Sequence, residues 1–162
     1  MRYRNIVMDG YPDPVSKEAF EKAEQIIGVK FPYPLYELVK DYDEGCPKDR
    51  SIKILFPGET EYSSNGLHAF LSFYPRNTTN IVAAYLYKPD HFPQDERFVS
   101  FGRTGDGDKI FFFYENGKDD LQPKVYYWAH EYCDIEGGLV FLANSFEEFL
   151  DMLKPDGYYD SL

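Results

Sequence analysis

Residues 98–114 read FVSFGRTGDGDKIFFFY, and two apolar blocks in this stretch surround a core of glycines and aspartates. Apolar blocks rich in aromatic and β-branched residues favour β-strands, and a short glycine–aspartate segment between them favours a tight turn. The stretch therefore predicts a β-hairpin, in which Gly105 and Gly107 supply the positive φ angles of the turn. Because the two strands of a hairpin are antiparallel, we expect a mostly antiparallel sheet built around this hairpin.

The same turn does not fit either of two ligand-binding loops. A phosphate-binding loop needs lysine and then a hydroxyl after its last glycine, but Asp108 and Lys109 stand at those positions. A calcium-binding EF-hand loop needs oxygen ligands at alternate positions, a pattern that Asp106 and Asp108 begin and Ile110 breaks. We therefore expect a plain turn, with weak adventitious cation binding as the alternative, and no cofactor.

Two short helices are predicted before the hairpin. Asp13 is the expected cap of the first helix, with Pro14 at its first position and Gly28 at its end. Its apolar face comprises Val15, Ala19, Ala23, Ile26 and Ile27. The second helix is expected to begin at Pro34. Its apolar residues are Leu35, Leu38, Val39 and Tyr42.

Strand patterns occupy most of the remaining chain. The expected strands are residues 51–56, 67–74, 97–101, 109–114, 124–132 and 139–143. Residues 78–88 favour a third helix capped by Thr78 or Thr79, although Tyr85 and Tyr87 leave a strand open. Residues 144–153 predict a closing helix with a capping box. That helix carries Ser145 and Glu148 at its start and a stripe of Phe146, Phe149, Leu150 and Leu153.

No repeat, long linker or low-complexity tract divides the 162 residues. The sequence predicts one α+β domain over residues 1–162, with a core of about 13–154. Its expected architecture is N-terminal helices, a mostly antiparallel sheet of about six strands, and a closing C-terminal helix.

The charge balance limits the class of partner. Seventeen basic and 28 acidic residues give a formal net charge of −11. Because nucleic acid is bound by clustered lysine and arginine, we expect no nucleic-acid partner. A basic protein would be attracted. No apolar run approaches the roughly 20 residues of a membrane span, and Cys46 and Cys133 suit reduced thiols. We expect a cytoplasmic protein, a monomer or weak homodimer, without a membrane partner.

Catalytic motifs are incomplete throughout the sequence. His130 and Glu131 begin a zinc-protease motif whose second histidine is missing, and Cys46 and Cys133 have no ligand spacing with the histidines. Ser63 and Ser64 do not lie in a nucleophile elbow. We therefore expect no enzyme and no metal site, and a small-molecule enzyme is the third choice.

The order of several segments resembles the SUKH superfamily, which is named partly for a yeast cell-wall-synthesis regulator. The matching segments are EAFEKAEQIIG, VKFPYPLYELVKDYDEG, the hairpin FVSFGRTGDGDKIFFFY, the strand from Val125 to Glu131, and LANSFEEFLDML. The resemblance runs from about Ala19 to Leu153. Residues 51–75 carry no matching motif, and Cys46 and Pro47 follow Gly45 where the family often has another glycine.

This resemblance implies a binding domain. Family members in bacterial toxin systems bind and block a cognate toxin, often a nuclease. The leading expectation is therefore an immunity protein, in agreement with the acidic charge. The alternative is a regulatory scaffold in cell-wall or stress signalling.

Three acidic segments are candidates for the contact surface, since carboxylates beside an aromatic anchor suit a basic partner. The first comprises Glu131, Tyr132, Asp134 and Glu136. The second comprises Glu59, Glu61 and Tyr62. The third comprises Asp106 and Asp108.

Overall fold

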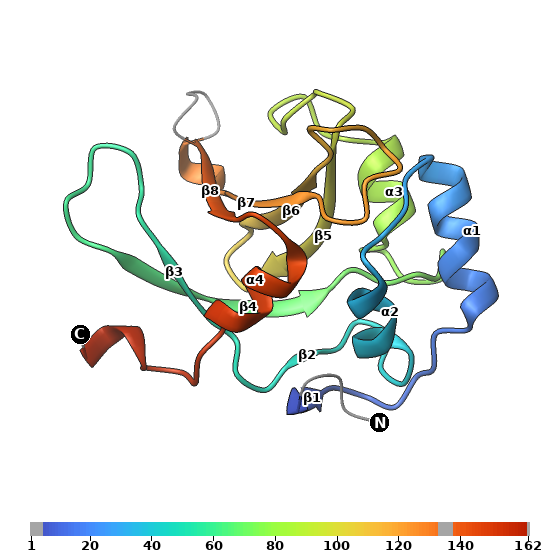
Figure 1. Cartoon of the computed structure of the whole chain (residues 1–162), viewed down its shortest axis with the longest axis horizontal. Coiled ribbons are helices and arrows are strands. Elements are labelled where there is room, and N and C mark those ends of the chain that lie inside the picture. Colours follow the sequence, from blue (N-terminus) through green and yellow to red (C-terminus); the bar gives the residue numbers. More distant parts are fainter. Residues whose placement is uncertain (1–4, 133–137, 162) are drawn as a thin grey trace.

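Six strands form an antiparallel sheet in the computed structural model, in which residues 5–132 and 138–161 are described. Each strand pairs with its neighbours in the sequence, so the spatial order is β3-β4-β5-β6-β7-β8. The strands are β3 (Ser51–Ile54), β4 (Ser63–Phe70), β5 (Phe98–Thr104), β6 (Lys109–Phe113), β7 (Lys124–Trp128) and β8 (Leu139–Ala143). A separate pair joins β1 (Met8–Asp9) to β2 (Cys46–Pro47) (Figure 1).

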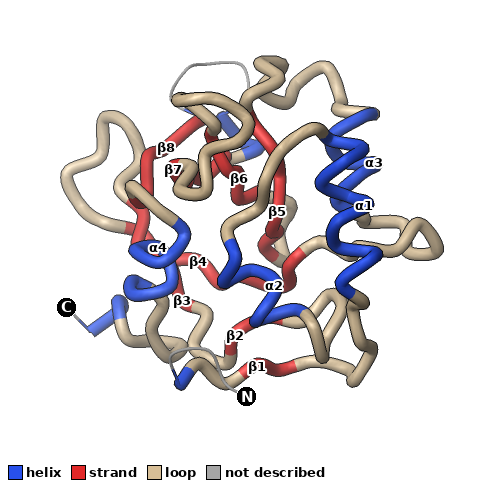
Figure 2. Tube along the Cα trace, turned by 45° about the vertical axis from the view of Figure 1, so that its right-hand side comes forward, coloured by secondary structure: helices blue, strands red, loops and turns tan. Residues whose placement is uncertain are grey.

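Four α-helices accompany the sheet: α1 (Lys17–Ile27), α2 (Tyr33–Val39), α3 (Ile81–Leu86) and α4 (Phe146–Met152). In Figure 2, α2 and α4 lie over one face of the sheet, whereas α1 and α3 lie side by side near β5. The predicted α+β fold, with helices first and a closing helix last, is confirmed.

Aromatic rings fill the layer between α4 and the sheet. Phe101 and Phe112 stack with their ring centroids 3.9 Å apart, and Phe146 packs against them at 5.6 and 5.5 Å. Phe149 is fully buried and contacts Phe101 at 5.9 Å. The stripe predicted for the closing helix is therefore the side of α4 that anchors it to the sheet.

The helix starts differ from the predicted ones. The cap of α1 is Ser16, whose hydroxyl accepts from the N–H of Ala19 at 3.0 Å, so Asp13 and Pro14 precede the helix. Asp13 instead pairs with Arg76 at 2.7 Å. Ile26, expected on the buried face, is 46% exposed. Gly28 ends the helix at φ 83°, as predicted.

The third helix is confirmed and its strand alternative is wrong. Its cap is Asn80, whose side chain accepts from the N–H of Ala83 at 2.8 Å, in place of Thr78 or Thr79. In α4 the Ser145 hydroxyl accepts from the N–H of Glu148 at 3.1 Å, as predicted.

Several strand limits also differ from the prediction, and β3 and β4 end at Ile54 and Phe70, before the expected residues 56 and 74. β4 begins at Ser63, inside the expected loop, because residues 63–66 pair with β3. β5 extends to Thr104, which leaves a four-residue connection in which Gly107 alone has positive φ, at 101°. β7 ends at Trp128, and residues His130–Tyr132 form the 3-10 turn η2. In this turn the N–H of Tyr132 donates to the Ala129 carbonyl at 3.0 Å, and the N–H of His130 donates to the Asp108 side chain at 3.0 Å.

Candidate functional site

A polar cleft of about 320 Å³ opens between the β3–β4 connection and the turn η2 that follows β7. Figure 1 shows the β3–β4 connection in teal at the left and the end of β7 in orange. The cleft collects residues from all three of the acidic segments predicted as contact surfaces. Those residues are Glu59, Asp106, Asp108, Glu131 and Tyr132.

The buried carboxylate of Asp108 forms the floor of the cleft. It is only 6% exposed and accepts a hydrogen bond from the Tyr127 hydroxyl. Its Oδ1 also lies 3.0 Å from the backbone nitrogen and 2.5 Å from Nδ1 of His130. Both carboxylate oxygens are therefore bound inside the protein. Asp108 shapes the cleft and presents no free carboxylate to a partner, unlike the contact residue that the sequence suggested.

A second set of hydrogen bonds joins this floor to the neighbouring strands. Asn65 Nδ2 donates to the Tyr127 hydroxyl oxygen at 2.7 Å and to Asp106 Oδ1 at 3.1 Å. The Thr104 hydroxyl donates to the same Asp106 oxygen at 2.5 Å. Strands β4, β5 and β7 are thus held to one another and to the β5–β6 turn by side chains as well as by backbone bonds.

These hydrogen bonds fix the charges of the site. The Thr104 hydroxyl lowers the pKa of the Asp106 carboxyl, so this group is ionised at neutral pH. Burial, reinforced by the hydrogen bond to Asp108, raises the pKa of Tyr127 well above its usual value. Tyr127 is therefore a neutral donor at neutral pH.

The rim of the cleft is acidic and aromatic. Glu59, Asp106 and Glu131 are exposed, and no lysine or arginine is among the described residues that line the cleft. One wall carries the Phe56 and Tyr132 rings, whose centroids lie 5.6 Å apart. The site therefore offers negative charge beside an apolar surface.

Two further predicted contact residues lie outside the cleft. Glu61 and Tyr62 do not line the cleft, and Lys53 Nζ lies 3.9 Å above the Tyr62 ring. Asp134 and Glu136 fall outside the described residues.

Two residues of the cleft were missed by the sequence reasoning in this role. The sequence places His130 in an incomplete zinc motif and in the strand from Val125 to Glu131, and it places Asn65 in a loop between two expected strands. A usable signal was the alternation of Asp108 with Ile110 and Phe112, since residues at a spacing of two share one face of a strand. That alternation places Asp108 on the buried face.

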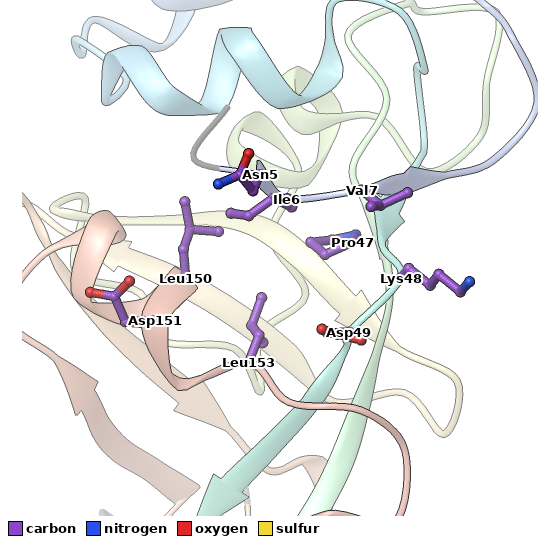
Figure 3. Close-up of a pocket in the computed structure, with 9 residues that line it drawn as sticks. All are labelled: Asn5, Ile6, Val7, Pro47, Lys48, Asp49, Leu150, Asp151 and Leu153. Atoms are coloured by element: carbon purple, nitrogen blue, oxygen red, sulfur yellow. The ribbon is translucent and has the colours of Figure 1, made fainter. Parts of the chain in front are cut away.

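Two other hollows have fewer convergent polar groups. Figure 3 shows one of about 300 Å³ beside α4, in which Ile6, Leu150 and Leu153 face the gap. The side chains of Lys48 and Asp151 extend away from it. An apolar groove of about 610 Å³ is lined by residues of α1, of α3 and of the segment 73–75. We therefore take the polar cleft as the candidate site.

The described part of the chain holds no group of three or more His, Cys, Asp or Glu side chains arranged to hold a metal. Within the same residues, no helix has the length and apolar character needed to cross a bilayer.

A protein-family model described as the SMI1/KNR4 family (SUKH-1) matches residues 14–152. The matched range contains all helices and strands from α1 to α4, and it confirms the resemblance inferred from the order of motifs. A comparison with curated proteins gives no match.

Proposed function

The chain belongs to the SMI1/KNR4 family (SUKH-1), and from this premise we propose that it is a protein-binding domain of the immunity type. The family includes toxin immunity proteins. In this proposal the domain is not an enzyme. It binds a cognate toxin with a basic surface, such as a nuclease, and blocks that surface.

The observation that carries the proposal is the set of carboxylates around the cleft. Glu59, Asp106 and Glu131 come from three separate segments, and none forms an ion pair with another described residue. Exposed carboxylates that form no ion pair remain available to a cation on another protein, and Asp106 keeps its charge while it accepts hydrogen bonds from Thr104 and Asn65. Complementary charge can raise association toward ~10⁸–10⁹ M⁻¹s⁻¹ at low salt, which suits a protein that must intercept a toxin.

A binding role fits the cleft better than nucleophilic catalysis does. The Asp108–His130 pair has the form of a base and its orienting carboxylate, but a nucleophile must donate to that base. The Ser64 hydroxyl, which also lines the cleft, donates instead to Asp160 at 2.9 Å.

The test uses the product of the neighbouring reading frame as the candidate toxin, in a form inactivated at its own catalytic site. Association is measured by stopped flow at low and high salt. We expect Glu59→Lys with Glu131→Lys to slow association several-fold at low salt and to flatten its salt dependence.

The matched control is Glu18→Lys with Glu21→Lys on α1, which changes the net charge equally at the far end of the sheet (Figure 1). Equal rates for the two double variants would contradict a role for the cleft. No binding of the neighbouring product at all would contradict the immunity proposal.

A further inference from the structure

We propose that the cleft receives a single arginine side chain of the partner, and that His130 is the residue that distinguishes arginine from lysine. This inference rests on the proposed function, because it specifies what part of a basic partner enters the site.

The first step concerns the orientation of the His130 ring. Its Nδ1 lies 2.5 Å from Oδ1 of Asp108, and its backbone N–H donates to the same oxygen at 3.0 Å. A carboxylate only accepts, so in the neutral ring the proton sits on Nδ1 and Nε2 is the acceptor. The side chain is 40% exposed and lines the cleft. In this neutral form, the ring that lines the cleft carries its acceptor on Nε2, the nitrogen that does not face Asp108.

The second step concerns the chemistry around that acceptor. Glu59, Asp106 and Glu131 add carboxylate oxygens from three different segments. The guanidinium of arginine is planar and carries five N–H donors in a fixed fork, whereas the lysine ammonium is a compact point charge with three donors. Several acceptors spread around one site therefore suit the guanidinium of arginine better than the ammonium of lysine.

The third step concerns the wall and the size of the cleft. The rings of Phe56 and Tyr132 lie 5.6 Å apart and are tilted to one another by 43°, so either ring offers one face on which a guanidinium can stack. A volume of about 320 Å³ is near the lower end for ligand pockets, so the cleft suits one side chain better than a folded segment.

The test uses the full chain labelled with ¹⁵N and two probes, N-acetyl-L-arginine amide and N-acetyl-L-lysine amide. Each is titrated into the protein while amide and imidazole nitrogen signals are recorded. We expect saturable shifts at the Asn65 side-chain amide, at the Glu131 and Tyr132 backbone amides, and at Nε2 of His130. Arginine amide should bind about tenfold more tightly than lysine amide, as expected from one or two extra hydrogen bonds.

Two variants sharpen the result. His130→Phe keeps a ring but removes the acceptor, so it should abolish the preference for arginine. Glu131→Gln should weaken both probes while keeping the preference, and its exposed position spares the fold. Even if His130→Phe does not fold, the Nε2 shift and the arginine preference of the unaltered chain decide the inference.

Equal affinity for the two probes, or shifts that lie away from the cleft, would overturn the inference. That outcome is independent of the toxin experiment. If the neighbouring product binds through the cleft and the probes are not distinguished, the inference fails while the proposed function stands. Arginine preference without binding of that product would contradict the immunity proposal alone.

Discussion

The aromatic layer under α4 and the polar network behind the cleft lie on the same face of the same sheet. Along β6 and its turn, Phe112, Ile110 and Asp108 alternate and are all buried. Phe112 is buried by ring packing, with Phe101 at 3.9 Å. The buried carboxylate of Asp108 is stabilised by hydrogen bonds that the Tyr127 hydroxyl and the His130 N–H donate.

The two regions depend on their neighbours in different ways. An apolar side chain tolerates many neighbours of suitable size, because dispersion and the hydrophobic effect are not directional. A buried carboxylate requires donors at particular positions. Losing a donor leaves a carboxylate oxygen unsatisfied, and losing the carboxylate leaves every donor without its acceptor. The aromatic layer therefore supplies most of the stability, while the polar network sets the shape of one site. Four variants test this difference.

The largest loss of stability is expected in the aromatic layer. Phe149→Ala removes a fully buried ring that contacts Phe101 and Phe146, and it should lower the free energy of unfolding by about 3–5 kcal/mol. Urea denaturation measures this. The control is Leu121→Ala, since Leu121 is 61% exposed and should change stability by less than about 0.5 kcal/mol. Similar midpoints for the two variants would show that α4 is peripheral.

A smaller loss is expected in the polar network. Asp108→Ala leaves the buried Tyr127 hydroxyl and the His130 N–H without their acceptor, at a cost of about 1–3 kcal/mol. Glu59→Ala, at the exposed rim, is the matched carboxylate control and should change stability by under about 0.5 kcal/mol. If both variants unfold at the same urea concentration, Asp108 is not part of the framework.

A pH-dependent effect is expected at Tyr127. Its pKa is raised in the folded protein by burial and by Asp108, so above about pH 10 the unfolded chain releases a proton that the folded protein retains. Stability should therefore be complete below pH 10 and fall as the pH rises, by about 1.4 kcal/mol per unit for this group.

In Tyr127→Phe this contribution is absent, so its stability should decline less steeply above pH 10. At neutral pH the same variant should lose about 1.5–3 kcal/mol, the value of a hydrogen bond to a charged group. Urea titrations at several alkaline pH values compare the two proteins. Parallel declines would mean that Tyr127 titrates in the folded protein as it does in the unfolded chain.

The smallest effect on stability is expected at the rim. Glu59→Lys with Glu131→Lys should change the free energy of unfolding by less than about 0.5 kcal/mol, because both side chains are exposed. This variant has its main effect on association. A large destabilisation would mean that these carboxylates belong to the framework, as Asp108 does.

Periodicity was sufficient to predict most of the fold. The stripe of α4 and the β5–β6 hairpin were found because burial repeats at the period of each element. The starts of α1 and α3 were missed because several residues able to cap a helix stand in a row. Asp13 competes with Ser16, and Thr78 and Thr79 compete with Asn80. Local sequence does not decide among them.

The cleft could be predicted only in parts. Glu59, Asp106 and Glu131 were each recognised as acidic candidates, but their convergence depends on pairing between distant strands. The turn η2 was predicted as strand because local periodicity does not contain its contact with Asp108, which lies 22 residues from His130 in the sequence. Whether a carboxylate is free or bound inside the fold depends on such contacts.

The strand order also determines when the core can close during synthesis. Each strand of the large sheet pairs with the one made just before it, so the sheet can grow hairpin by hairpin as the chain leaves the ribosome. The helix that covers Phe101 and Phe112 is made after all of the strands, because α4 begins at Phe146. A nascent chain that stops before α4 therefore leaves this aromatic surface in contact with water, and such surfaces promote aggregation. For a newly made copy, formation of α4 is the step that covers this aromatic surface and so lowers the risk of aggregation with other copies.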